Sequence, residues 1–82
     1  MIEVKFFASL RDQLGTDALS LEAHKITTAA EVRAQLIANH PHWQTPLSAE
    51  NLLVAINQTM GNFSTSVHDG DEVAFFPPVT GG

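Results

Sequence analysis

The stretch TAAEVRAQLIANHP, residues 28–41, predicts a helix in the middle of the chain. Thr28 and Glu31 have the T-x-x-E spacing of a capping box, which satisfies backbone N–H groups at the start of a helix. Apolar residues then recur at helical spacing at Val32, Leu36 and Ile37. Pro41 lies just past the expected end of the helix, where proline commonly follows because it cannot continue one.

The first eight residues, MIEVKFFA, alternate as a half-buried strand does. The apolar side of this alternation holds Ile2, Val4, Phe6 and Ala8. Phe7 is an exception, because it stands with Glu3 and Lys5 on the polar side.

The other segments are assigned from the spacing of their apolar residues and from the turn residues between them. Strands are expected over residues 18–23, 52–57 and 72–76, with a short, weak strand within 58–65. Residues 9–16 predict one or two helical turns that stop at Gly15. Residues 42–51 are expected to form a loop whose Trp43 and Leu47 pack into the core.

The order of these elements, ββαβββ, predicts an α+β fold. We expect a sheet of about five strands with one main helix packed on one face. At 82 residues the chain is expected to be a single domain, residues 1–82, whose tail over residues 78–82 is flexible.

Composition excludes several classes of function. The net charge of −5 is unfavourable for binding a nucleic-acid backbone. The first residues lack the pattern of a signal peptide, and no apolar run is long enough to span a membrane. The chain contains no cysteine, so no side-chain thiol can act as a nucleophile or carry sulfur. These features favour a cytoplasmic protein without membrane contact.

The side chains offer no recognisable catalytic constellation. His40 and His42 form the closest histidine pair, but a zinc site needs three or four ligands. The acidic run DGDE, residues 69–72, lacks the spacing of a calcium loop and is explained by a turn before a strand. We therefore expect neither a metal site nor a self-contained active site.

Two aromatic residues are expected on the helix-free face of the sheet. If the last strand alternates, Val73 and Phe75 face the core and Phe76 faces outward. Phe76 would then stand beside Phe7 if the first and last strands are neighbours, and Met60 is a candidate third member. An exposed apolar patch marks a surface for a partner. The alternative is that one Phe turns inward or that a loop covers both.

The chain finishes with FFPPVTGG, residues 75–82. Pro77 and Pro78 stiffen the exit from the last strand, and Val79 and Thr80 extend it. Gly81 and Gly82 have no side chains, so they form a thread that fits a channel too narrow for larger residues. The thread presents the Gly82 carboxylate, which adenylation would activate. The alternative is a frayed terminus.

Three stretches together carry a resemblance that spans the chain: MIEVKFFASLRDQLGTD, VAINQTM and DGDEVAFFPPVTGG. With the ββαβββ order, they resemble the small, sulfur-carrying subunits of molybdopterin synthase. FFPPVTGG is the most specific of the motifs. The resemblance implies a ubiquitin-like β-grasp fold, in which the first and last strands are adjacent and parallel.

The resemblance also implies a function. An ATP-dependent activating enzyme adenylates the terminal glycine, here Gly82, and a sulfur donor converts it to a thiocarboxylate. The tail, with Gly81 behind the reactive group, then inserts into the large synthase subunit and donates sulfur to a cyclic pterin precursor. This builds the dithiolene of molybdopterin. The chain is thus expected to be a non-catalytic subunit of a heterotetramer, with no bound cofactor.

The family's partner surface, carried over by position, comprises Phe7, Arg11, Met60, Phe76, Pro77, Pro78, Val79 and Thr80. Three other functions remain open from the sequence. They are a sulfur carrier for thiamin or tRNA thiolation, a ubiquitin-like protein modifier, and a β-grasp binding module that does not use its tail.

Overall fold

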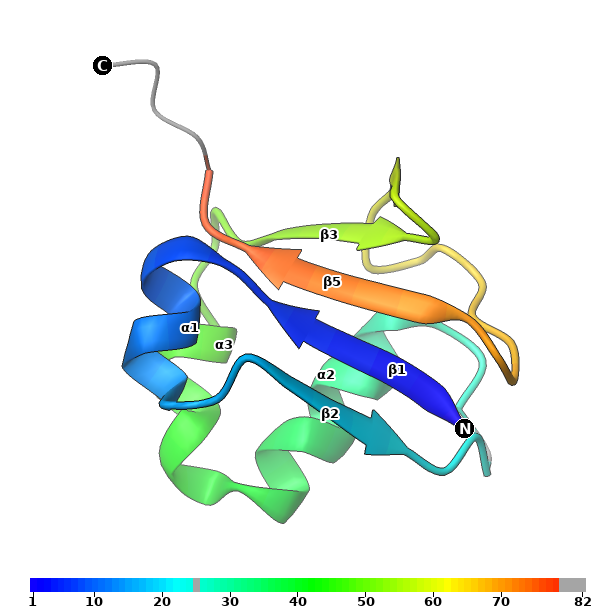
Figure 1. Cartoon of the computed structure of the whole chain (residues 1–82), viewed down its shortest axis with the longest axis horizontal. Helices are drawn as coiled ribbons and strands as arrows, with labels where there is room; N and C mark the ends of the chain where they lie inside the picture. Colours follow the sequence, from blue (N-terminus) through cyan, green and yellow to red (C-terminus); the bar gives the residue numbers. More distant parts are fainter. Residues whose placement is uncertain (25, 79–82) are drawn as a thin grey trace.

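The computed structural model of the chain describes residues 1–24 and 26–78 and contains one mixed sheet (Figure 1). Its strands are β1 (Ile2–Phe6), β2 (Ala18–Leu21), β3 (Leu53–Ile56), β4 (Thr59–Met60) and β5 (Glu72–Phe76). The helical segments are α1 (Ala8–Leu14), α2 (Ala29–Asn39), the 3-10 turn η1 (Pro41–Trp43) and α3 (Gln44–Leu47).

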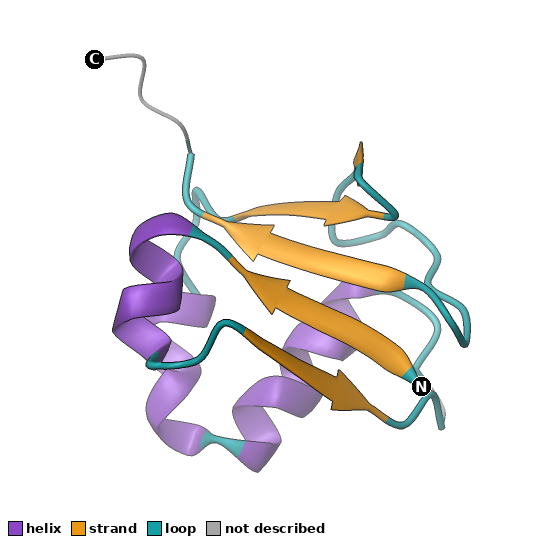
Figure 2. Cartoon of the chain, viewed as in Figure 1, coloured by secondary structure: helices purple, strands orange, loops and turns teal. Residues whose placement is uncertain are grey.

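The strands lie in the order β2-β1-β5-β3-β4. β1 and β5 are parallel neighbours in the middle of the sheet, and the other pairs are antiparallel. α2 and α3 lie behind the sheet, which leaves its other face free of helices (Figure 2). These findings confirm the predicted α+β architecture of five strands with the main helix on one face.

The start of α2 is fixed by side chains and by a distant loop. The N–H of Glu31 donates to Oγ1 of Thr28 at 3.3 Å, as the capping box predicts. The Glu31 carboxylate, however, accepts the N–H of Thr27, one residue earlier than in the standard box, at 2.9 Å. The N–H groups of Ala29 and Ala30 donate to carbonyls of the loop before β5. The first turn of α2 is therefore tied to the residues that lead into β5.

The core lies between the sheet and the helices. Its largest fully buried side chains include Phe6 of β1, Phe75 of β5 and Leu36 of α2. The ring of Phe75 lies between those of Phe6 and Phe63, at a centroid distance of 6.2 Å from each. Apolar burial of this kind supplies most of the stability of a small domain. Burial of Phe75 therefore helps to hold β5 in the middle of the sheet.

The prediction of a loop over residues 42–51 is wrong in part. Residues 41–47 form η1 and α3, although Trp43 and Leu47 are buried as expected. Pro41 opens η1, and Pro46 is the third residue of α3. Proline is tolerated in a first turn because the N–H it lacks has no partner there. Pro41 and Pro46 are therefore compatible with short helical segments, and Pro46 does not mark an irregular loop.

The chain leaves β5 at Pro77, at the end of the sheet where α1 lies (Figure 1). Pro77 and Pro78 follow β5 and are half-buried. Of the predicted flexible tail, Val79, Thr80, Gly81 and Gly82 lie outside the described residues. Among the helices described, none is long and apolar enough to cross a membrane.

Candidate functional site

The candidate site lies on the helix-free face of the sheet. Lys5 of β1 lies opposite Ala74 of β5, and Ala74 lies opposite Ala55 of β3. Ala55 in turn lies opposite Met60 of β4. Because paired residues point to the same side of a sheet, these four side chains form one row across the outer face.

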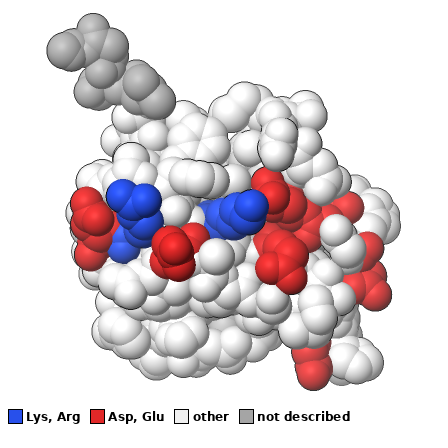
Figure 3. Space-filling model, viewed as in Figure 1, with Lys and Arg blue, Asp and Glu red and all other residues white. Residues whose placement is uncertain are grey.

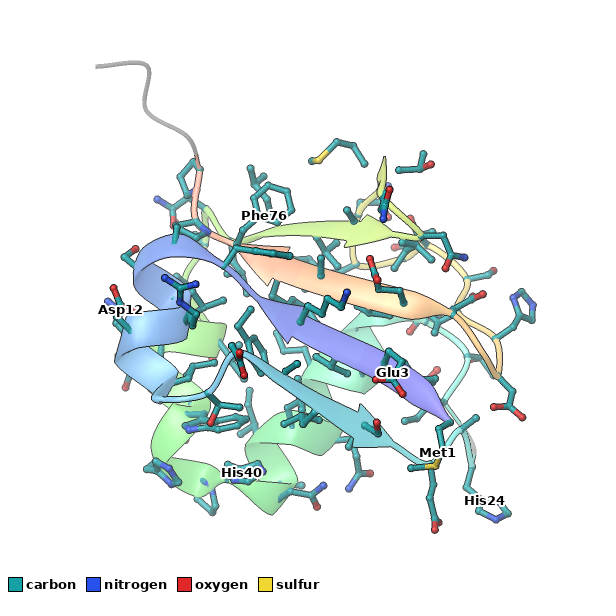
Figure 4. The ribbon with its side chains drawn as sticks, in the orientation of Figure 1. Met1, Glu3, Asp12, His24, His40 and Phe76 are labelled. Atoms are coloured by element: carbon teal, nitrogen blue, oxygen red, sulfur yellow. The ribbon has the colours of Figure 1, made fainter. Side chains whose placement is uncertain are left out.

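The next row on the same face lies two residues further along β5, at Phe76. Phe76 is paired with Leu53 of β3. The N–H of Phe7 donates to the carbonyl of Phe75 at 3.2 Å, which extends the β1–β5 pairing by one residue. Phe7 therefore lies beside Phe76, as the alternation of the two strands predicts. Figure 4 labels Phe76 at this end of β5.

Two of the predicted contact residues are exposed to an unusual degree for their type. The exposed fraction is 47% for Phe7 and 58% for Met60. Phe76, Pro77 and Pro78 are half-buried. Together these five residues make an apolar surface at the exit of the chain. Surfaces of this kind are typical of protein–protein interfaces.

The apolar surface contains a groove of about 460 Å³. Ala55 and Ala74 are buried to more than 90% but lie outside the main core cluster, so they form its floor. Its walls are Lys5, Phe7, Ala8, Gln58, Glu72, Phe76 and Pro77. Met60 is not among the lining residues, yet it flanks the groove through its pairing with Ala55. The groove is large enough to accept an apolar side chain from another protein.

The backbone at Ala8 sets the position of Phe7. Phe7 is extended, whereas Ala8 has a φ of +55°, in the left-handed region that residues other than glycine seldom adopt. This change of direction ends β1 and starts α1, whose Leu10 and Leu14 turn into the core. Phe7 consequently stays on the outer face. The prediction that Ala8 continues the strand on its buried side is wrong, because Ala8 is exposed.

Arg11 lies on α1, one turn after Phe7. Its N–H donates to the Phe7 carbonyl, and its side chain is 53% exposed. Its charged group lies 3.9 Å from the Asp12 carboxylate, a long contact for an ion pair. Arg11 is therefore available to a partner that binds at the Phe7 end of the groove.

Lys5 is a second basic group on this face, and it is held more tightly. Nζ of Lys5 lies 3.0 Å from Oε1 of Glu72. Figure 3 shows basic and acidic groups side by side in the middle of this face, with uncharged surface between them and the exit of the chain. The apolar surface is thus bordered by charged groups on the side away from the exit of the chain.

The structure brings together most of the described residues of the predicted site. Phe7, Phe76 and Pro77 line one groove, Met60 flanks it, and Arg11 lies a turn away. Val79, Thr80, Gly81 and Gly82 lie outside the described residues, so their assigned roles remain predictions.

Sequence reasoning missed the floor and the charged border of the groove. The alternation of the last strand placed Ala74 on the outer face, but nothing in the sequence pairs it with Ala55 or places Lys5 beside Glu72. These neighbours come from distant parts of the chain. They become visible once the register of β1, β5 and β3 is known.

The histidines do not form a metal site in the part of the chain that the structure describes. No group of three or more potential ligand side chains occurs among residues 1–24 and 26–78. The ring of His40 stacks on the buried Trp43 at 3.9 Å between centroids, and that of His42 lies 6.0 Å from the ring of His40. The pair thus covers one edge of the core.

A family model for the ThiS family matches residues 4–82. The chain belongs to the ThiS family. The molybdopterin synthase sulfur carrier subunit of Haemophilus influenzae is 48% identical over 82 residues, which is 100% of both chains. This agrees with the family resemblance found in the sequence.

Solved structures of similar fold include two informative neighbours of this ThiS family member. SAMP1 of Haloferax volcanii, a small archaeal modifier protein, superimposes with a TM-score of 0.82 at 25% identity and covers 99% of this chain and 98% of its own. The complex of subunits 1 and 2 of the molybdopterin-converting factor of Helicobacter pylori gives a TM-score of 0.68 at 26% identity, with 99% and 97% covered. The fold is accordingly the ubiquitin-like β-grasp.

Proposed function

We propose that this ThiS family member is the sulfur carrier subunit of a molybdopterin synthase. The single observation that carries the proposal is the 48% identity, over the full length of both chains, to the subunit of that name from H. influenzae. The apolar groove next to the exit of the chain supports it, because a carrier has to bind a partner while its tail enters the active site of that partner.

The proposed reaction uses the Gly82 carboxylate. A carboxylate oxygen attacks the α-phosphorus of ATP on an activating enzyme, and pyrophosphate leaves. A sulfur nucleophile at the oxidation level of sulfide then attacks the acyl carbon and displaces AMP. The product is a thiocarboxylate. ATP is consumed by the activating enzyme, and the carrier itself needs no bound cofactor.

Sulfur is then passed to the pterin precursor. The thiocarboxylate sulfur forms a bond to a carbon of the precursor, and an oxygen substituent leaves that carbon. Water then cleaves the bond between sulfur and the acyl carbon. The oxygen of that water restores the carboxylate, so the carrier can be charged again. A second cycle completes the dithiolene. The catalytic residues belong to the large subunit, and the carrier is not an enzyme on its own.

The proposed partners bind the same face. The large subunit would contact Phe7, Arg11, Met60, Phe76 and Pro77, with the tail from Pro78 to Gly82 inserted in its active site. The molybdopterin-converting factor of H. pylori, whose two subunits form a complex, supports assembly with a large subunit. We further propose a cytoplasmic heterotetramer with one carrier at each end of a dimer of large subunits.

Intact-mass spectrometry tests the proposal. The protein is incubated with ATP, the activating enzyme and a sulfur source, and we expect a mass gain that corresponds to one oxygen replaced by sulfur. A variant without Gly81 and Gly82 is the control and should stay unchanged while keeping its fold. The charged protein should then support molybdopterin formation with the large subunit. Absence of the mass change under conditions that charge the H. influenzae subunit would refute the proposal.

A protein modifier is the second candidate function. The superposition on the H. volcanii modifier protein favours it specifically. A modifier would form isopeptide bonds from Gly82 to lysines of other proteins, and peptide mass spectrometry of cell extracts would detect these adducts. A carrier forms none, so the same extracts separate the two functions.

A further inference from the structure

The position of Lys5 is the starting point, because it conflicts with the apolar character of the site. In the register of the sheet, Lys5 lies directly opposite Ala74, on the floor of the groove. A lysine at this point can extend its ammonium over the two alanines. The groove would then present a charge where an apolar side chain from a partner has to sit.

Glu72 keeps the ammonium of Lys5 away from the two alanines, because it binds that ammonium on the other side. It precedes Ala74 by two residues on β5, so its side chain lies on the same face but toward the start of the strand. With Nζ of Lys5 only 3.0 Å from Oε1 of Glu72, the ammonium is turned away from Phe7 and Phe76. The floor of Ala55 and Ala74 remains open between them.

Glu72 is itself well anchored. Its N–H donates to Oδ1 of Asn57 at 2.9 Å, and its side chain is 25% exposed, compared with 44% for Lys5. Glu3 of β1 is another carboxylate on this face. It accepts a hydrogen bond from the hydroxyl of Ser20 at 2.8 Å and is not paired with Lys5. Glu72 is therefore the carboxylate that positions Lys5 among the described residues, and Glu3 provides a matched comparison.

We propose that Glu72 is a positioning residue for the partner face. By holding Lys5 at the border of the groove, it keeps the floor of Ala55 and Ala74 free for one large apolar side chain of the synthase large subunit. This inference rests on the proposed function. The groove is continuous with the proposed interface, because Phe7, Phe76 and Pro77 form its walls.

The energetic reason is the cost of an unpaired buried charge. When the partner docks, it removes water from this face. A paired ammonium at the border keeps its carboxylate partner, whereas a released ammonium over the floor has to be desolvated without one. Removal of Glu72 alone should therefore weaken binding more than removal of both charges.

Isothermal titration of the large subunit with four carrier variants tests the inference. For Glu72→Gln we expect binding about tenfold weaker, which is less than the loss for a fully buried pair because Lys5 is 44% exposed before the partner docks. Lys5→Met should bind more tightly than the wild type, and Lys5→Met/Glu72→Gln should recover the loss. The control Glu3→Gln removes the same charge from the same face and should bind as the wild type does.

Sulfur-transfer kinetics with the carrier in its thiocarboxylate form give a second readout. Glu72→Gln should raise the KM for the carrier and leave kcat unchanged, because the tail and its chemistry are intact. The exchanged pair Lys5→Glu/Glu72→Lys should restore KM, which also separates positioning from a folding defect. Thermal melts establish that each variant is folded.

Two results would overturn the inference. One is that Lys5→Met weakens binding as much as Glu72→Gln and the double variant brings no recovery, since the pair would then be a direct contact. The other is that Glu72→Gln binds as the wild type does. If the wild-type carrier neither binds the large subunit nor transfers sulfur, the proposed function fails, and this inference fails with it.

Discussion

The side chain of Asn57 joins the end of β3 to Asp71, the residue before β5: its amide donates to Oδ1 of Asp71 at 3.0 Å. The amide oxygen of Asn57 accepts the N–H of Glu72 in addition. Asn57 has a φ of +50°, a conformation that asparagine tolerates better than most residues. One residue thus closes the β3–β4 turn and fixes the start of β5.

Asn57→Ala should therefore destabilise the protein. We expect a loss of about 1–3 kcal/mol in the free energy of unfolding, because two hydrogen bonds disappear and alanine is strained at positive φ. Urea denaturation followed by circular dichroism measures this loss. Asn51→Ala, at an exposed position before β3, is the control and should change stability little. Equal stability of the two variants would contradict the role of Asn57.

The stability of the protein should fall in acid. The hydrogen bond from the Asn57 side chain, and then the N–H of His68, lower the pKa of Asp71. Bonding to the Met1 ammonium lowers the pKa of Asp69, and the hydrogen bonds from Thr27 lower the pKa of Glu31. Each carboxylate therefore stabilises the folded state fully above the ordinary carboxyl pKa. This stabilisation is lost as pH falls through the lowered value in the folded protein.

Thermal melts between neutral pH and strong acid measure this dependence. In Asn57→Ala the pKa of Asp71 should rise toward its ordinary value, which NMR titration of the carboxyl group detects. The dependence of stability on pH in acid should become shallower, because the part of the Asp71 contribution that comes from the Asn57 hydrogen bond is lost. A pH profile of Asn57→Ala that runs parallel to the wild-type profile would argue against this coupling.

Binding of the large subunit should depend on the exposed apolar residues. Phe7→Ala and Met60→Ala should each weaken binding by about tenfold or more, because aromatic and large apolar side chains dominate the energy of an interface. Stability should change little, since both side chains are mostly exposed. The control is His42→Ala, an exposed position on the helical side. Unchanged affinity of Phe7→Ala, measured by titration, would place the interface elsewhere.

Two glycines should respond differently to alanine. At Gly15, which ends α1 with a φ of +68°, an added Cβ meets nothing within 4 Å, so the cost is the strained backbone, about 1 kcal/mol. At Gly61 the Cβ would lie 2.7 Å from Oγ1 of Thr65, which accepts the N–H of Asn62. Gly61→Ala should therefore cost more, about 2 kcal/mol. Urea denaturation of both variants measures the two losses in the free energy of unfolding. A smaller loss for Gly61→Ala than for Gly15→Ala would show that Thr65 moves aside freely.

Local patterns in the sequence were sufficient for the strands and the main helix. The alternation of residues 1–8 predicted β1 but not its end at Phe6, because alanine is not a residue that signals a turn and Ala8 nevertheless has a positive φ. The helical turns over residues 41–47 were missed, because prolines in first turns look the same in the sequence as prolines in loops.

The sequence by itself determined the period of each strand, the capped start of α2 and the motif FFPPVTGG with its glycines, because these depend on neighbouring residues. The tertiary structure decided which side chains meet. The placement of Phe7 beside Phe76 and the pairing of Lys5 with Glu72 arise from strands at opposite ends of the chain. The floor of Ala55 and Ala74 arises from two strands, β3 and β5, that are not consecutive in the chain. Their register is set by burial of the whole core, which no local pattern encodes.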